Sequence, residues 1–168
     1  MTDLAKPKKV LFVDDTELDI RRFRAGMARV QRTYESYFAS DVAAALGLAH
    51  ETQFDAAIID LRMPSGSLGD PDTQFGSETG YVLAGKIISQ NPNIHIIILS
   101  NDRSANDLEA DFRESLNIRH IFSKTEINPV DLIRKLDHIF GIKSSDPNIF
   151  LVHGHDRSLV NFVQDTVE

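Results

Sequence analysis

The sequence has no cysteine among its 168 residues and no apolar run long enough to cross a membrane. Without cysteine the chain can form neither a disulfide framework nor a thiolate metal site, which fits a cytosolic protein. The polar stretch from Met1 to Lys9 lacks the apolar core of a signal peptide. We therefore expect a cytoplasmic protein with no membrane partner.

Positive charge is scarce as well. The chain has 18 Lys and Arg residues against 25 Asp and Glu residues, and its formal net charge is −7. Binding to nucleic acid needs a basic face that neutralises phosphates, so this balance argues against a nucleic-acid partner. The two basic clusters, at residues 6–9 and 21–24, are interpreted as a solvated terminus and a solvated helix face.

What the sequence does contain is a regular alternation of apolar runs and helical patterns, which is typical of an α/β fold with a parallel sheet. Five such β/α units suit a flavodoxin-like, doubly wound sheet with strand order 2-1-3-4-5. The expected strands span residues 9–14, 34–39, 54–59, 94–99 and 120–123. The expected helices span about residues 18–30, 41–50, 81–89, 104–116 and 129–140.

Three of these helices begin with recognisable capping signals. Thr16 to Asp19 resembles a capping box in which Asp takes the place of the usual Glu. Ser40 or Asp41 can cap the second helix. Asn128-Pro129 supplies a cap followed by proline at the first helical position of the last one.

Polar residues follow four of the predicted strands. Asp14 and Asp15 close the first apolar run, Asp60 closes the third, Ser100 ends the fourth and Lys124 follows the fifth. Acids at the ends of buried strands are costly unless something pairs them, and the natural partner is a cation. Three oxygen donors at one place suit Mg²⁺.

These strand ends are expected to meet. Right-handed crossovers place all carboxyl ends of a parallel sheet at one edge, and ligands bind where the strand order reverses. In the order 2-1-3-4-5 that point lies between strands 1 and 3, which carry the acids. Ordinary structural alternatives stay open: Asp60 as a turn cap, Ser100 as a helix cap and Lys124 as a surface lysine.

Such a set of side chains suits phosphoryl transfer. A carboxylate held beside Mg²⁺ can act as a nucleophile toward phosphorus. Mg²⁺ and the Lys124 ammonium can cancel charge on the equatorial phosphoryl oxygens, and the Ser100 hydroxyl can donate to one of them.

At this point the chain resembles a response-regulator receiver domain. The resemblance covers about Lys8 to Gly141 and is carried by Val13-Asp14-Asp15, by Asp60-Leu61-Arg62-Met63-Pro64, by Ser100 and by Lys124. It implies the flavodoxin-like fold already expected from the β/α alternation.

The resemblance also implies the site. Asp60 would be the phospho-acceptor, Asp15 and Asp60 would bind Mg²⁺ directly, Asp14 would bind it through water, and the backbone carbonyl of Arg62 would complete the coordination. Ser100 would be the switch hydroxyl that follows the phosphoryl group, and Lys124 would pair with that group.

A receiver domain implies particular partners. The phosphoryl group would come from a histidine kinase or a histidine phosphotransfer protein, and the signal would pass to an attached effector domain. The chain would act as a self-phosphorylating acceptor, with autodephosphorylation as an added activity, rather than as a conventional enzyme. Homodimers are common in the family, and one is a candidate here by analogy.

The sequence departs from the family pattern near the site. Thr125 replaces the usual proline after the lysine, Asn101 replaces a small residue after the switch hydroxyl, and Ile121 replaces the aromatic switch residue. An insertion at residues 65–79 precedes Gly80, where the family has a short turn. This loop is interpreted either as a lid or docking element, or as a tolerated surface insertion.

The last part of the chain is a separate element. The expected receiver domain covers residues 1–141, a linker covers 142–148, and a sixth apolar run opens the segment 149–168. Residues 149–156 resemble the first strand and loop of TIR-like nucleotide-binding domains. The segment is therefore the start of a second domain or a C-terminal extension packed on the first.

Two other functions compete with the phosphorylated receiver. One is a pseudo-receiver, a binding module that never carries phosphate, which Asn101, Ile121 and the insertion favour. The other is the regulatory part of a TIR-like effector that processes nucleotides or NAD.

Overall fold

The computed structural model describes residues 6–31, 33–68, 79–101, 116, 118 and 120–143. The chain divides into two compact units, Met1–Pro129 and Val130–Glu168. Nearly all of the expected helix at 104–116, most of the insertion at 65–79 and the whole TIR-like segment at 149–168 lie outside the described residues. The predicted domain boundaries remain a prediction.

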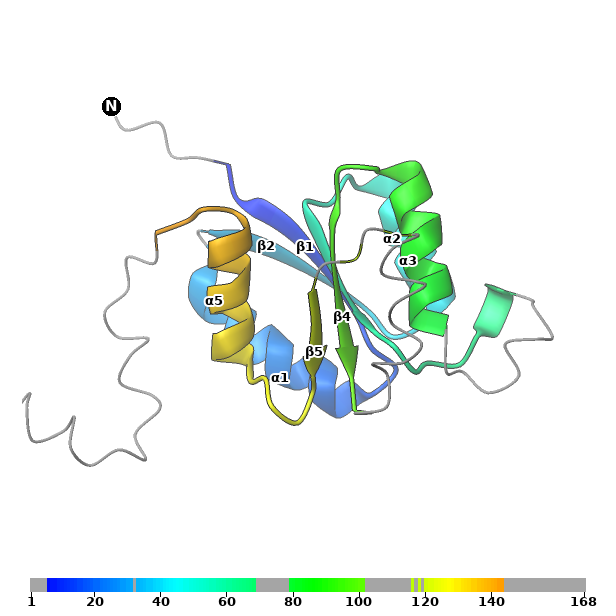
Figure 1. Ribbon diagram of the computed structural model, residues 1–168, viewed down its shortest axis with the longest axis horizontal. Coiled ribbons are helices and arrows are strands. Elements are labelled where there is room, and N and C mark those ends of the chain that lie inside the picture. Colours follow the sequence, from blue (N-terminus) through cyan, green and yellow to red (C-terminus); the bar gives the residue numbers. More distant parts are fainter. Residues whose placement is uncertain are drawn as a thin grey trace, which may run out of the picture. The chain divides into compact units, whose positions relative to one another are not determined.

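The first unit contains one five-stranded sheet in which every pair of neighbouring strands is parallel (Figure 1). The strand order is β2-β1-β3-β4-β5, so the predicted fold class and topology are confirmed. The strands are β1 (Lys8–Val13), β2 (Tyr34–Ala39), β3 (Ala56–Asp60), β4 (His95–Ser100) and β5 (His120–Ser123).

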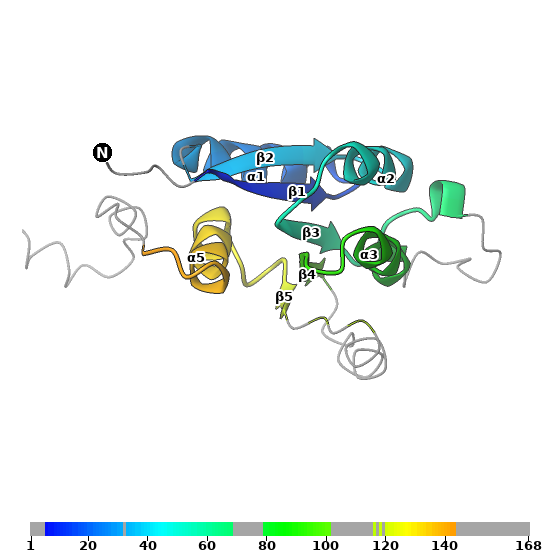
Figure 2. The same ribbon diagram turned by 90° about the horizontal axis from the view of Figure 1, so that it is seen from above.

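Three of the described helices in the first unit cover the sheet. They are α1 (Glu17–Met27), which continues into a short 3-10 turn at Ala28–Val30, α2 (Val42–Glu51) and α3 (Thr79–Gln90). A second 3-10 turn occupies Gly66–Leu68. Figure 2 shows α2 and α3 side by side, with α1 on the opposite face of the sheet.

The unbroken apolar strands are explained by cover on both faces. In β1, Leu11 and Val13 belong to the buried core that contains residues of α2 and α3. Phe12, between them, points the other way, and its ring centroid lies 4.5 Å from that of Phe23 in α1. Alternate residues of one strand therefore pack against helices on opposite faces.

The two capping predictions in the first unit have different outcomes. Asp41 caps α2, because its carboxylate accepts a hydrogen bond from Ala44 N at 2.8 Å. The capping box at Thr16 to Asp19 is wrong: Thr16 stands at the N-cap of α1, but its side chain makes no capping hydrogen bond. Its backbone N–H donates instead to Asp14 Oδ1 at 2.9 Å, so the end of β1 takes the donor that the box requires.

The last described helix is α5 (Pro129–Ile139), which starts at the expected proline. Leu132, Ile133 and Leu136 are buried in the structure. The chain leaves the helix at Gly141, whose φ of +63° lies in the left-handed region that glycine adopts without strain.

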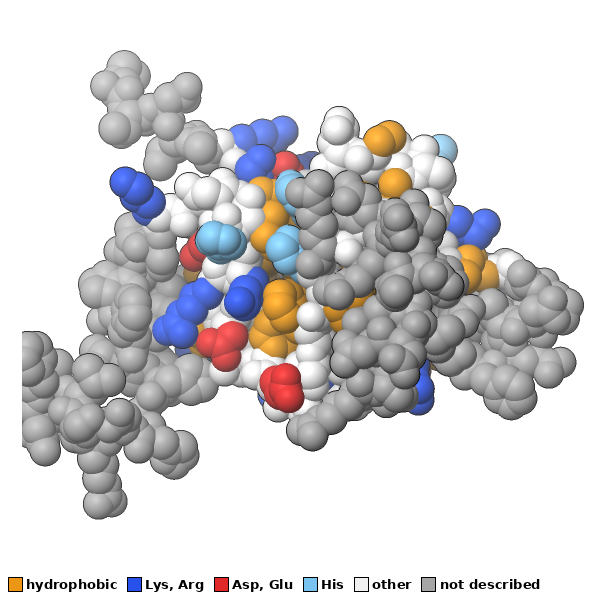
Figure 3. Space-filling view, viewed as in Figure 1, with side chains coloured by type: hydrophobic (Ala, Val, Ile, Leu, Met, Phe, Trp, Pro, Cys, Tyr) orange, Lys and Arg blue, Asp and Glu red, His pale blue; other side chains and the backbone are white. Residues whose placement is uncertain are grey.

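Two findings concern the expected absence of membrane and nucleic-acid partners. No helix within the described ranges is both long and apolar enough to span a membrane. On the face drawn in Figure 3, the basic side chains of the described residues are spaced apart, with acidic ones among them, rather than gathered into one broad patch.

Candidate functional site

The register of the sheet brings the predicted site residues to one edge. Val13 pairs with Ile59, so Asp14 and Asp60 follow neighbouring positions of β1 and β3. Asp60 pairs with Leu99, which puts Ser100 one residue further along β4. Ser100 in turn pairs with Ser123 of β5, and Lys124 is the next residue. The expectation that these strand ends meet is confirmed.

Three carboxylates cluster at this edge. Asp14, Asp15 and Asp60 each offer an oxygen, and these oxygens lie within 4.8 Å of one another. Asp14 is 0% exposed and Asp60 is 5% exposed, whereas Asp15 is exposed to solvent. Two of the three acids therefore need partners inside the protein.

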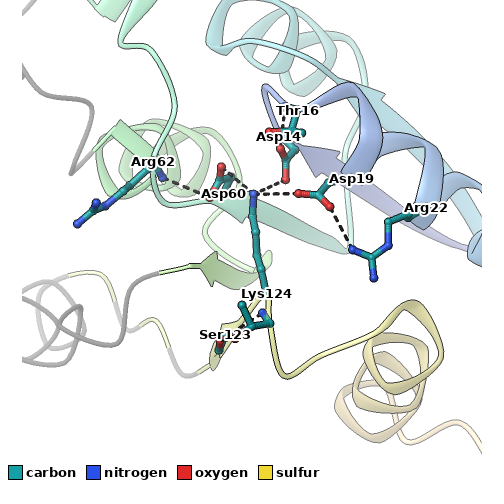
Figure 4. A network of polar contacts seen from close by, with 9 residues as sticks. Asp14, Thr16, Asp19, Arg22, Asp60, Arg62, Ser123 and Lys124 are labelled. Atoms are coloured by element: carbon teal, nitrogen blue, oxygen red, sulfur yellow. Dashed lines mark hydrogen bonds and ion pairs between the residues drawn. The ribbon is translucent and has the colours of Figure 1, made fainter.

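Lys124 supplies that partner. Its Nζ lies 2.7 Å from Asp14 Oδ2 and 2.9 Å from Asp60 Oδ2, and its side chain is only 8% exposed (Figure 4). Figure 4 shows the lysine reaching from the end of β5 to the space between the two acids. The ammonium therefore bridges the two buried carboxylates, and the surface-lysine alternative is excluded.

Backbone amides hold the other oxygens of the same two acids. Thr16 N donates to Asp14 Oδ1 at 2.9 Å, and Arg62 N donates to Asp60 Oδ1 at 3.3 Å. Each carboxylate thus has one oxygen fixed by the amide two residues later and one oxygen on Lys124. This fixes the orientation of both carboxylates relative to the edge of the sheet.

The residues fit a divalent cation. Oδ2 of Asp14 is buried, and its one described partner is the Lys124 ammonium at 2.7 Å, which leaves one of its lone pairs unused. A buried carboxylate oxygen with spare acceptor capacity, next to two more carboxylates, matches the hard oxygen donors that Mg²⁺ prefers. The acidic cluster can therefore hold a metal ion of this kind.

The environment changes the acidity of two groups. Burial raises the pKa of Asp60 from 3.8 to about 6, an effect that contact with Lys124 only partly offsets and that the nearby Asp14 charge reinforces. Burial also pushes the pKa of Lys124 down, but its contacts with Asp14 and Asp60 outweigh this, and the net pKa is raised. Near pH 7 the pair is an ammonium facing a carboxylate.

The approach of α3 to β3 depends on glycine. Gly80 N donates to Leu61 O at 3.0 Å. A Cβ at this position would lie 2.7 Å from Leu61 Cα and closer still to the carbonyl oxygen of Asp60. Only glycine allows the helix backbone to come this near, so the first turn of α3 lies directly beside Asp60.

The remaining predicted residues are placed as follows. Ser100 is 2% exposed, and its carbonyl accepts a hydrogen bond from Lys124 N at 2.9 Å. The side chain of Arg62 is directed away from the acids, and its amide is the group that contacts Asp60 (Figure 4). Asn101 is exposed, and Ile121 is partly buried against the core.

One residue of the network was missed by sequence reasoning. Asp19, assigned above to a capping box, lies with its Oδ2 3.5 Å from Lys124 Nζ. A signal for it exists, because α1 begins directly after the acidic pair and its first turn must therefore lie at the same edge of the sheet. Local capping rules pointed instead to the backbone of Thr16.

Comparisons with known proteins agree with this architecture. No protein-family model matches the sequence, and no curated protein does. Among solved structures, a CheY-like response regulator receiver domain protein from Methanospirillum hungatei JF-1 is 19% identical, with a TM-score of 0.65 over 81% of this chain and 95% of that one.

Two further structures are similar. The signal receiver domain of an HD domain-containing protein from Pseudomonas fluorescens Pf-5 is 22% identical, with a TM-score of 0.65 over 84% of this chain and 100% of that one. The isolated REC domain of RcsB from Salmonella enterica serovar Typhimurium, solved with the phosphomimetic BeF3-, is 22% identical, with a TM-score of 0.63 over 86% of this chain and 96% of that one. This chain has the fold of the CheY-like receiver domains of response regulators.

Proposed function

We propose that this chain is a phospho-accepting receiver domain in which Asp60 takes a phosphoryl group from a phosphohistidine. The observation that carries the proposal is the Lys124 ammonium, held 2.9 Å from Asp60 Oδ2 and 2.7 Å from Asp14 Oδ2 at the edge where the carboxyl ends of the strands meet. Asp15 adds a third carboxylate to this pair of acids. An ion pair that served stability alone would not require it.

The chemistry assigns a role to each side chain. One oxygen of the Asp60 carboxylate forms a bond to phosphorus while the phosphorus–nitrogen bond of the donor breaks, and the departing imidazole keeps the electron pair and takes up a proton. Lys124 gives up its contact with that carboxylate and pairs with a phosphoryl oxygen. Ser100, at the end of the neighbouring strand, donates its hydroxyl to another oxygen.

A magnesium ion would be held by Asp14, Asp15, Asp60 and the backbone carbonyl of Arg62. When bound, it neutralises charge on the phosphoryl oxygens and on the acids around it. The hydrogen bonds from Thr16 N and Arg62 N keep the carboxylates of Asp14 and Asp60 in orientations that leave an oxygen of each for other partners.

The proposal includes partners and an output. The donor is a histidine kinase or a histidine phosphotransfer protein, and the phosphorylated domain acts on an attached effector or on a second copy of itself. A phosphate adds about −1.5 to −2 charges, which becomes a signal only through an element with two arrangements. Ser100 with the chain that follows it is our candidate for this element. The cysteine-free composition supports a cytoplasmic location.

The test is intact-mass spectrometry after incubation with acetyl phosphate and Mg²⁺. We expect a gain of one phosphoryl group in the wild-type chain, no gain in Asp60→Asn, and no gain when the cation is removed by chelation. Lys124→Gln should be phosphorylated more slowly. A gain that persists in Asp60→Asn would show that the acceptor is another residue.

A pseudo-receiver is the second candidate, favoured by exposed Asn101 directly after Ser100 and by Ile121 in place of an aromatic residue. Under that alternative the wild-type chain gains no mass from acetyl phosphate. Its partners, recovered on immobilised protein, would bind Asp60→Asn and wild type equally well.

A further inference from the structure

Lys124 has three carboxylate partners, and they are not equivalent. Its Nζ lies 2.7 Å from Asp14, 2.9 Å from Asp60 and 3.5 Å from Asp19. Asp14 and Asp60 belong to the cluster whose oxygens can hold a metal, whereas Asp19 does not. Asp19 is thus the one described partner of the ammonium that stays available when the cation site is used.

Asp19 contacts both the site and its own helix, with one carboxylate oxygen toward each. Its carboxylate does not close a capping box at Thr16, although the local sequence favours one. Instead Oδ2 faces Lys124 and Oδ1 lies 3.4 Å from Arg22, and the side chain is 18% exposed (Figure 4). Glu17, two residues earlier in the same turn, shows the contrast: it is 62% exposed and pairs with Arg21 on the surface.

We propose that Asp19 is a positioning residue that retains the Lys124 ammonium beside the site when Asp14 and Asp60 bind a cation. The proposal deepens, and in this respect rests on, the proposed receiver function. An ammonium that is 8% exposed cannot leave its carboxylates for water at low cost, so a third carboxylate lets it release the other two without losing every partner. Lys124 then stays within reach of a phosphoryl oxygen.

The proposal predicts in which direction the affinity for a cation changes when Asp19 is replaced. In Asp19→Asn, Lys124 depends on Asp14 and Asp60 alone, so the ammonium competes more strongly with a cation for their oxygens. Cation affinity should therefore fall. The loss of one negative charge near the site lowers affinity in the same direction, and this general effect is measured with a matched control.

The matched control is Glu17→Gln, which removes the same charge from the same helical turn but from a side chain paired with Arg21 at the surface. Binding of Mg²⁺ to the full 168-residue chain is followed by the shifts of backbone amide signals in NMR spectra. We expect Asp19→Asn to weaken binding about fivefold and Glu17→Gln to change it less than about twofold. Asp19→Glu should restore much of the affinity, because it keeps the carboxylate.

A second measurement needs no cation. Urea unfolding at low salt is compared for the wild-type chain, Asp19→Asn, Lys124→Gln and the double variant, a cycle in which the lost Asp19–Arg22 contact cancels. We expect Asp19→Asn to lower the folding equilibrium constant about five- to tenfold with Lys124 present, and clearly less with Gln at position 124. Equal effects in both backgrounds would overturn the pairing of Asp19 with Lys124.

The two measurements separate the failure of each idea. If the wild-type chain binds no Mg²⁺, the proposed cation site is wrong, and with it the exchange that we assign to Asp19, even where the urea cycle shows coupling. If the wild-type chain binds Mg²⁺ but Asp19→Asn behaves like Glu17→Gln, the positioning role is wrong and the cation site stands. Weaker binding in Asp19→Asn together with coupling in the urea cycle supports the role.

Discussion

Lys124 Nζ lies 2.9 Å from Asp60 Oδ2, so the lysine contacts the candidate acceptor directly. The same ammonium lies 2.7 Å from Asp14, whose carboxylate is fully buried. The single ammonium of Lys124 thus offsets the desolvation cost of two carboxylates from different strands. The stability of the fold and the chemistry that we propose for the site therefore depend on the same side chain.

Removal of the Lys124 ammonium should destabilise the protein. Lys124→Met leaves Asp14 and Asp60 without their ammonium, and we expect the free energy of unfolding near pH 7 to fall by on the order of 3 kcal/mol. The matched control is Lys8→Met, because Lys8 pairs with Asp55 at the same 2.9 Å but both side chains are partly exposed, so its loss should cost about 1 kcal/mol or less. Urea denaturation measures both, and equal losses would contradict a special role for the buried pair.

The acidity of Asp60 predicts a pH dependence of stability. Its pKa is about 6 in the folded chain and 3.8 as its ordinary value, so between these values the folded state binds more protons than the unfolded state. The stabilisation of the folded chain by the protonated Asp60 carboxyl is therefore fully present below pH 3.8 and is lost as the pH rises through about 6.

Asp60→Asn should remove this part of the pH profile. We expect the free energy of unfolding of the wild-type chain, relative to Asp60→Asn, to decrease by up to about 3 kcal/mol from pH 4 to pH 7. Urea unfolding across this range, without divalent cations, provides the measurement. Parallel profiles for the two proteins would mean that the pKa of Asp60 is not raised by burial.

The close approach at Gly80 predicts a sharp glycine effect. Gly80→Ala places a Cβ against the backbone of Asp60 and Leu61, and we expect a loss of about 2 kcal/mol together with slower phosphorylation of the displaced Asp60. Gly47→Ala in α2 is the control, since its Cβ would meet nothing within 4 Å, and it should stabilise the chain by about 0.5–1 kcal/mol. Thermal unfolding of the two variants should show opposite shifts.

The two N-caps predict unequal costs for similar changes. Asp41→Ala removes the hydrogen bond from Ala44 N and should destabilise the chain by about 1 kcal/mol. Thr16→Ala should change stability by only a few tenths of a kcal/mol, because the Thr16 side chain makes no capping hydrogen bond and its backbone N–H still reaches Asp14. A large effect of Thr16→Ala would mean that its hydroxyl does cap α1 in solution.

Much of the architecture could be predicted because it is encoded locally. Apolar runs, such as those around Phe12 and Ile58, alternate with helical patterns and so specify five β/α units. The handedness of crossovers then restricts the topology. The polar residues that end these runs, Asp14, Asp60 and Ser100, follow from the same pattern, as does Lys124. The ends of the described strands and helices differ from the predicted ones by at most two residues, which is the usual uncertainty of such boundaries, except that the last three residues of the first predicted helix form the 3-10 turn Ala28–Val30.

The sequence by itself therefore determined the sheet, its order and the edge at which the acids meet, because periodicity and strand ends are local properties of the chain. Only the tertiary structure decided how those groups pair. Lys124 and Asp14 are far apart in the sequence, and their 2.7 Å contact depends on the register of three strand pairs, β1 with β3, β3 with β4 and β4 with β5. Asp19 likewise lies 3.5 Å from the same ammonium instead of closing its expected cap, because the Thr16 amide that the cap requires donates to Asp14.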